Sequence, residues 1–154
     1  GSEMCIRDSL LIVGDGSLKE QMQQQAKDST TNKYITWAGR QEQEQLQAYY
    51  DMIDILLIPS RSEGFGLTAI EGMARGCVVV ASNAGGLPEI VKDKETGLLH
   101  EKENIEDMVK KIHHLLENPQ IMERFSMKAT KYAKQFIHEQ YTLLFNDLYS
   151  KIRR

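Results

Sequence analysis

The chain has 154 residues, 41% of them hydrophobic, with a formal net charge of -3 and a pI near 5.8. This length suits one domain with a sizeable core. A slightly acidic chain without a basic stripe argues against nucleic-acid binding, which needs clustered Lys and Arg. No apolar run approaches the roughly 20 residues that cross a bilayer, and no signal-peptide pattern opens the chain. Cys77 precedes an apolar run and is expected to be a buried, reduced thiol. We therefore expect a soluble, cytoplasmic protein.

The first nine residues fit none of the elements that follow. They read Gly-Ser-Glu-Met-Cys-Ile-Arg-Asp-Ser. Residues 2–9 match an in-frame translation of the mosaic-end adapter used in transposase-based sequencing libraries. We expect residues 1–9 to be a non-native segment on a reading frame from a metagenomic fragment, and we exclude them from fold reasoning. An ordinary variable N-terminus is the alternative. The predicted domain covers residues 10–154.

From residue 10 onward, apolar runs and helical periodicity alternate along the chain. In chain order the predicted elements are a buried strand over 10–13, a helix over 18–27, a strand over 34–37, a helix over 42–52, a strand over 54–58, a helix over 67–75, a strand over 78–81, a helical turn over 88–91, a strand over 98–99 and helices over 104–117, about 120–135 and 138–152. This order predicts a doubly wound, Rossmann-like α/β domain with a parallel sheet and C-terminal helices. Ligands bind such sheets beyond the carboxyl ends of the strands.

The turn between the third predicted strand and the third predicted helix has the strongest functional signal. It runs from Pro59 to Glu71 and reads Pro-Ser-Arg-Ser-Glu-Gly-Phe-Gly-Leu-Thr-Ala-Ile-Glu. Gly64 and Gly66 lack a Cβ, so a ligand can approach the backbone closely where the first N–H groups of the helix point outward. Such a place suits a phosphate. Glu63 and Glu71 flank the helix start, and carboxylates accept hydrogen bonds from paired hydroxyls of a ribose or a hexose.

This turn resembles the E-x7-E motif of the retaining glycosyltransferases of group 1 (family 4), which have the GT-B fold. Further blocks resemble the C-terminal, donor-binding half of the family in order and spacing. They are Gly14-Asp15-Gly16, Gly39-Arg40, Asp54 to Ser60, Gly85-Gly86-Leu87-Pro88-Glu89 and Thr96-Gly97-Leu98-Leu99. The resemblance covers Leu10 to about Tyr149. It implies transfer of a sugar from a nucleotide-diphosphate sugar to an acceptor, with retention and without a cofactor.

The resemblance also implies a role for each residue of the site. Glu63 is the expected catalytic residue and would position the hydroxyls of the transferred sugar beside Phe65. It is not assigned as a covalent nucleophile, because two-carboxylate glycosidase chemistry needs both groups at one anomeric carbon. Glu71 would accept hydrogen bonds from the ribose. N–H groups at the helix start would hold the diphosphate, and the backbone near Arg40 and Gln41 would edge the base. The expected donor-binding residues are Gly64, Phe65, Gly66, Leu67, Thr68, Glu71, Arg40 and Gln41.

In this family, a further strand and helix precede the part that matches Leu10, and they supply the basic residues that meet the diphosphate. The acceptor-binding N-terminal half of the family also has no counterpart in this sequence. We therefore expect this chain to be part of an enzyme, and we expect its partner to be the missing acceptor-binding half. The alternative is a non-catalytic nucleotide-sugar-binding fragment, inactive in isolation. A nicotinamide-dependent oxidoreductase is disfavoured because Gly-x-Gly-x-x-Gly is absent.

Two other residue patterns in the sequence favour a structural interpretation over a functional one. His113 and His114 are adjacent, so they diverge on a helix and cannot chelate one ion together, and we expect no metal site. A set of basic residues near the C-terminus favours a solvated helix face, with contact to anionic lipid head groups in the full-length protein as the alternative. These residues are Lys128, Lys131, Lys134, Lys151, Arg153 and Arg154.

Overall fold

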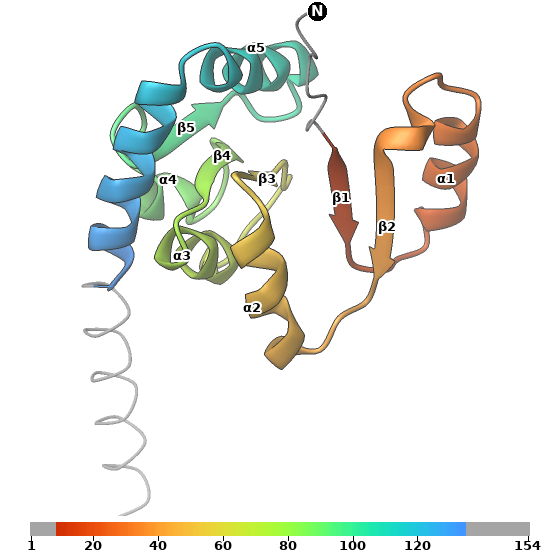
Figure 1. Cartoon of the computed structure of the whole chain (residues 1–154), viewed down its shortest axis with the longest axis horizontal. Coiled ribbons are helices and arrows are strands. Elements are labelled where there is room, and N and C mark those ends of the chain that lie inside the picture. The colour runs from red at the N-terminus through yellow and green to blue at the C-terminus, as the bar shows by residue number, and fades with distance from the viewer. Residues whose placement is uncertain (1–8, 135–154) are drawn as a thin grey trace, which may run out of the picture. The chain divides into compact units, whose positions relative to one another are not determined.

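The computed structural model describes residues 9–134. The chain divides into two compact units with the boundary after Leu46, inside helix α2 (Gln43–Met52). Figure 1 labels the elements, and the order of strands and helices along the chain follows the predicted alternation. The predicted helix over 138–152 lies outside the described residues, as does the segment 1–8.

The first unit contains a short parallel ladder. Its elements are β1 (Leu10–Val13), α1 (Lys19–Lys27), the 3-10 helix η1 (Asn32–Tyr34) and β2 (Ile35–Gly39). Strands β1 and β2 pair from Leu10 opposite Ile35 to Val13 opposite Gly39. None of residues 9–46 is buried, and Leu10 and Val13 are 43% and 38% exposed. The predicted burial of this first strand is therefore wrong, because a two-stranded ladder beside a polar helix covers little apolar surface.

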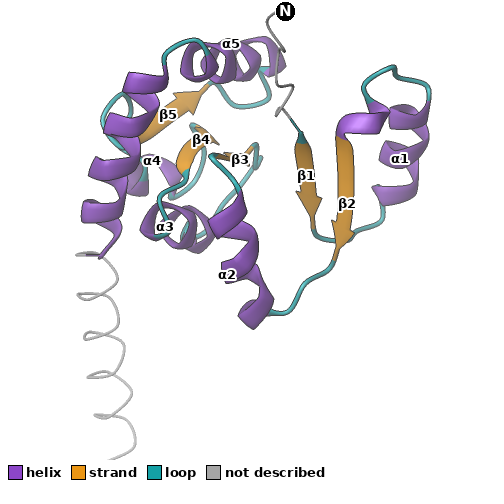
Figure 2. Ribbon diagram, viewed as in Figure 1, coloured by secondary structure: helices purple, strands orange, loops and turns teal. Residues whose placement is uncertain are grey.

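The second unit is a three-stranded parallel sheet with helices on both faces (Figure 2). Its further elements are β3 (Ile55–Ile58), α3 (Leu67–Ala74), β4 (Val78–Ser82), α4 (Leu87–Ile90), β5 (Gly97–His100), α5 (Ile105–Leu116) and a helix over 119–134. The strand order is β3-β4-β5, with every pair parallel. Strand β4 is central and all five of its residues are buried, as expected for a continuous apolar run covered on both faces.

Alternate residues of β4 pack into two separate cores. Val79 and Ala81 join the core formed with α3 and α4, whereas Val78 and Val80 join the core formed with α5. The helix over 119–134 contributes to both, since Phe125 lies in the α5 core and Ala129 and Ala133 lie in the other. The same helix is joined by two hydrogen bonds to earlier parts of the chain, the turn after α3 and helix α4. Ser126 Oγ donates to the carbonyl of Gly76 at 2.7 Å, and Tyr132 Oη donates to the carbonyl of Glu89 at 3.3 Å.

The predicted doubly wound α/β class is confirmed, although the strands form two separate parallel sheets. Element ends also agree with prediction to within one or two residues. Gly76 lies directly after the C-cap of α3 with φ +92°, and residue Asn118 interrupts the helices as expected. None of the helices in residues 9–134 combines the length and the apolar character that crossing a membrane requires.

Candidate functional site

The turn between β3 and α3 is shaped by Gly66. This glycine is the N-cap of α3 and has left-handed backbone angles, φ 69° and ψ 29°. A Cβ at this position would also lie 3.3 Å from Cγ1 of Ile90. Both the backbone angles and the close neighbour require glycine here. Gly64, two residues earlier, has open space around it and no such backbone angle. The two glycines of the predicted motif therefore differ, and only Gly66 is needed for the local geometry.

The carboxylate of Glu63 bends back over this turn. Its Oε1 accepts a hydrogen bond from the backbone N–H of Gly66 at 3.4 Å, and its Oε2 accepts one from the Ser60 hydroxyl at 3.5 Å. Both distances are at the long end of hydrogen bonding, so each bond is weak. A carboxylate offers about four acceptor positions. The turn therefore orients Glu63 while acceptor capacity remains for hydroxyls of a ligand.

A second loop, after β4, packs directly on this turn. The N–H of Gly86 donates to the carbonyl of Glu63 at 2.9 Å, and the Ser82 hydroxyl donates to the carbonyl of Ser60. A Cβ on Gly85, whose φ is 56°, would collide with the same Glu63 carbonyl, and one on Gly86 would lie 2.6 Å from the carbonyl of Gly64. The Gly85-Gly86 pair therefore permits two backbones to touch. The sequence does not predict this contact between the two loops.

The start of α3 presents a polar surface with exposed side chains around it. α3 has eight residues, and the N–H groups of Leu67 and Thr68 at its start precede the first hydrogen bond of the helix, which Ala69 donates to the carbonyl of Gly66 at 3.0 Å. Phe65 and Leu67 are 56% and 60% exposed, and Thr68 is exposed as well. The positive end of the helix dipole and these N–H groups favour an anion. The predicted phosphate-binding residues thus lie together at one helix end.

Glu71 lies in the second turn of α3 and is contacted by a residue from another helix. The hydroxyl of Tyr50, on α2, donates to Oε2 of Glu71 at 3.0 Å. Burial raises the pKa of the Tyr50 phenol, the negative charge of Glu71 and this hydrogen bond raise it further, and the side chain of Thr68 acts in the opposite direction. The phenol therefore stays protonated and remains a donor. Tyr50 is not among the site residues that the sequence predicts.

The remaining predicted donor-binding residues belong to the first unit. Arg40 is exposed, and the side-chain amide of Gln41 donates to the carbonyl of Ala38 at 2.7 Å. Both follow β2 directly, at the carboxyl end of that strand. Their contact with a base stays a prediction.

The Gly14-Asp15-Gly16 turn, also in the first unit, uses its polar groups internally. Gly14 donates its N–H to the carbonyl of Gly39 at 2.7 Å. The carboxylate of Asp15 accepts from the N–H of Gly16 at 2.9 Å and from the Lys19 ammonium at 3.1 Å. The hydrogen bond from Lys19, followed by that from Gly16, lowers the pKa of Asp15. A tight turn between β1 and α1 accounts for these contacts.

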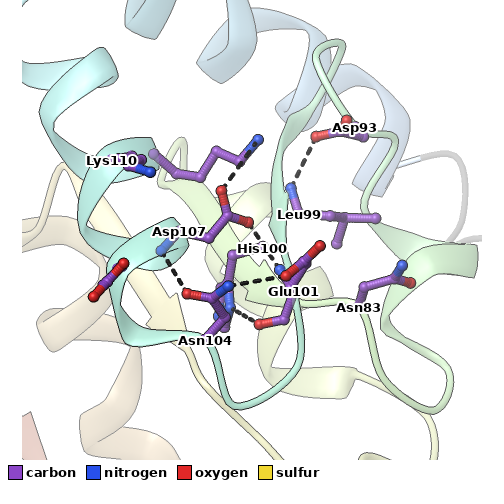
Figure 3. A pocket seen from close by; sticks show the side chains of 10 residues that line it. Asn83, Asp93, Leu99, His100, Glu101, Asn104, Asp107 and Lys110 are labelled. Carbon is purple, nitrogen blue, oxygen red and sulfur yellow. Dashed lines mark hydrogen bonds and ion pairs between the residues drawn. The ribbon is translucent and has the colours of Figure 1, made fainter.

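A pocket at the carboxyl end of β5 contains none of the predicted site residues (Figure 3). Its polar side chains form a helix-capping network, in which Asn104 Oδ1 accepts from the N–H of Asp107 and Asp107 Oδ2 accepts from the N–H of Glu101, each at 2.9 Å. His100 is buried, with Nδ1 at 2.8 Å from the carbonyl of Glu101 and with no partner among the described residues for Nε2. We interpret this network as the cap of α5.

The adjacent histidines His113 and His114 lie on α5. His113 and His114 are both exposed. In the described part of the chain no three His, Cys, Asp or Glu side chains come together in a way that could hold a metal ion. Lys128, Lys131 and Lys134 are exposed on the helix over 119–134, and the other basic residues of the predicted set lie outside the described range.

Comparison with known proteins identifies the family. The family model of the glycosyl transferases group 1 matches residues 8–134. The chain belongs to this family. Among its relatives, an uncharacterized glycosyltransferase of Methanocaldococcus jannaschii is 32% identical over 141 residues, which are 92% of this chain and 40% of that protein. A D-inositol 3-phosphate glycosyltransferase of Streptomyces bingchenggensis is 33% identical over 112 residues, which are 73% of this chain and 25% of that protein.

Two solved structures have the same fold. A sucrose-phosphate synthase from Thermosynechococcus elongatus superposes with a TM-score of 0.79 at 27% identity, over 93% of this chain and 39% of that one. A TarM variant from S. aureus, solved with fondaparinux, α-GlcNAc-glycerol and UDP, superposes with a TM-score of 0.75 at 28% identity, over 90% of this chain and 29% of that one. This group 1 chain therefore spans 40% or less of the length of these four proteins.

Proposed function

We propose that this group 1 glycosyltransferase chain binds the nucleotide-diphosphate sugar from which the complete enzyme transfers a sugar, with retention, to an acceptor. The observation that carries the proposal is the turn from Glu63 to Glu71, in which a left-handed Gly66 opens the N-terminus of α3 between two oriented carboxylates. Each part of this turn suits one part of such a donor.

The diphosphate would lie against the helix start. The N–H groups of Leu67 and Thr68 begin the first turn of α3, at the positive end of the helix dipole, and the N–H of Gly66 makes only a long 3.4 Å hydrogen bond to Glu63 that a phosphate oxygen could replace. Negative charge grows on the diphosphate as the glycosidic bond breaks, and fixed donors aimed at that charge stabilise the transition state. These N–H groups would thus help the nucleotide diphosphate to leave in the reaction and would also bind it in the donor.

The two carboxylates would hold the two ends of the donor. Glu71 would accept hydrogen bonds from the ribose, and Glu63 would accept them from the transferred sugar beside the exposed ring of Phe65. We assign Glu63 a catalytic role, in which its carboxylate contacts and positions the transferred sugar. It does not form a covalent bond to that sugar. Arg40 and Gln41 would edge the base. The transferred unit would be a hexose, in keeping with the sucrose-phosphate synthase and inositol glycosyltransferase among the relatives.

A non-catalytic role for the isolated chain is the second candidate. It is favoured because the chain spans 40% or less of the length of the four proteins compared above. Transfer requires donor and acceptor to be held in line, which contributes several kcal/mol to lowering the barrier. We therefore assign donor binding to this chain and transfer to the complete protein with its acceptor-binding half.

Calorimetric titration of the 154-residue chain with UDP-glucose, UDP, GDP and ADP tests the proposal. UDP comes first because the TarM variant was solved with it. Replacing Glu71 with Ala should weaken binding about tenfold or more, the effect of losing a hydrogen bond to a charged group. Glu123→Ala is the matched control, since Glu123 is exposed on the helix over 119–134. Absence of binding by the parent chain, or a Glu71→Ala variant that binds as tightly as the parent and Glu123→Ala, would contradict the proposed site.

Loss of Glu71 also removes the partner of the buried Tyr50 hydroxyl. Glu71→Gln is therefore measured alongside, because its amide oxygen can still accept from the phenol. Both variants are first checked for folding by circular dichroism. An affinity loss in a variant that melts at the parental temperature reports on the ligand contact rather than on the fold.

A further inference from the structure

The hydroxyl of Tyr50 is a buried polar group to which the proposed donor site gives no role of its own. Tyr50 is 8% exposed and its phenol donates to Glu71 Oε2 at 3.0 Å. Phenylalanine would fill the same core volume without needing a hydrogen-bond partner, whereas a buried tyrosine hydroxyl needs one. The partner here is the carboxylate that we propose for the ribose.

The backbone that carries Tyr50 is fixed against the end of α3. The Cys77 thiol donates to the carbonyl of Tyr50 at 3.3 Å. The neighbouring carboxylate of Asp51 accepts two hydrogen bonds from Arg75, at 3.1 and 3.2 Å, and Arg75 also donates to the side chain of Gln47 at 2.6 Å. These contacts hold the last turns of α2 beside the helix that carries Glu71, so the phenol has a defined place from which to donate.

A glutamate side chain on a helix has several rotatable bonds, and ordering it on ligand binding costs free energy. A hydrogen-bond donor bound to a carboxylate restricts the orientation of the group, which has about four acceptor positions in all. We propose that Tyr50 is a positioning residue for the nucleotide-sugar donor: its hydroxyl holds the Glu71 carboxylate in the orientation from which this carboxylate accepts the ribose hydroxyls. This inference rests on the proposed function of Glu71.

Two other roles for the same bond give different results. If Tyr50 only packs in the core, its hydroxyl contributes to stability and not to ligand discrimination. If the phenol competes with the ribose for Glu71, its removal strengthens nucleotide binding. Positioning predicts instead that removal weakens binding, and only for ligands that carry the ribose hydroxyls.

The test compares Tyr50→Phe with the parent chain by calorimetry, using UDP, GDP and ADP and the 2′,3′-dideoxy form of each. Tyr49→Phe is the matched control, because Tyr49 lies on the same helix and is only partly buried. For the nucleotide that the parent binds, Tyr50→Phe should weaken the ribose form about fivefold and leave the dideoxy form within about twofold. Tyr49→Phe should change neither. In a Glu71→Gln background the effect of Tyr50→Phe should largely disappear.

The outcomes separate this inference from the function on which it rests. A parent chain that binds none of the diphosphates, or that binds ribose and dideoxy forms equally, overturns the proposed role of Glu71 and this inference with it. A parent that prefers the ribose form, with a Tyr50→Phe variant that binds it as well or more tightly, overturns the positioning role alone. Equal weakening of both forms, or a full effect of Tyr50→Phe in the Glu71→Gln background, also overturns it.

Discussion

Replacing Gly85 with Ala should destabilise the second unit strongly, because two backbones touch at this glycine. Gly85 has φ 56°, and an added Cβ would meet the carbonyl of Glu63. A left-handed backbone angle costs an L-residue roughly 1–2 kcal/mol, and overpacking costs about 1–3 kcal/mol. Backbone cannot swing aside as a side chain can, so we expect a total loss of about 2–5 kcal/mol. That is a large share of the roughly 5–15 kcal/mol that stabilises a typical domain.

Urea unfolding measures this loss, with Gly64→Ala as the control. Gly64 has open space around it and no left-handed angle, so its substitution should change stability by no more than about 1 kcal/mol in either direction. The signal should be far-UV circular dichroism, because the single tryptophan, Trp37, lies in the first unit. Faster hydrogen exchange over residues 59–66 in Gly85→Ala would locate the damage at the facing turn. If Gly85→Ala and Gly64→Ala are equally stable, the two loops are not packed as described.

Gly66→Ala should lower the free energy of unfolding by roughly 1–2 kcal/mol because of the left-handed N-cap, and by more because the new Cβ would lie 3.3 Å from Ile90 Cγ1. The same substitution should weaken UDP binding. If Gly66→Ala is as stable as Gly64→Ala, the requirement for glycine at this position is contradicted. Cys77, in a Cys5→Ser variant, should react very slowly with a disulfide reagent at about pH 8, because burial raises the pKa of its thiol to about 11. Reaction should speed up with rising pH and become rapid in denaturant, and rapid reaction of the native protein would show that the thiol is not buried.

The fold class could be predicted from the sequence because its signals are local. Apolar runs, Gly76 after a helix and Asn118 before the next one fixed the element order and most boundaries. The predicted burial of Leu10–Val13 was wrong, because burial depends on what packs against a strand and an apolar run does not reveal its neighbours. The pairing of the strands into two sheets could not be predicted for the same reason, since no residue pattern shows which strands are adjacent.

The candidate site could be predicted only where its residues lie close together in the sequence. The spacing of Glu63, Gly66 and Glu71 can be read directly from the sequence, and the structure places Gly66 at the N-cap of α3. Tyr50 was missed because it lies 21 positions from its partner and its ring fits an inner helix face equally well. The contact of Gly85 with Glu63 was missed because a Gly-Gly pair signals a turn whether or not another backbone passes beside it. Long-range contacts of this kind are what the structure adds.

The helix over 119–134 has a consequence for how the protein is made. Phe125 completes one core and Ala129 and Ala133 complete the other, while Ser126 reaches back to a carbonyl 50 positions earlier. A ribosome delivers the chain from its N-terminus at about 5–20 residues per second. Strand β4 therefore emerges seconds before Phe125, Ala129 and Ala133, which complete the cores on its two faces. During that interval the valines of β4 lack part of their cover, and neither core can be completed until the helix over 119–134 has been synthesised.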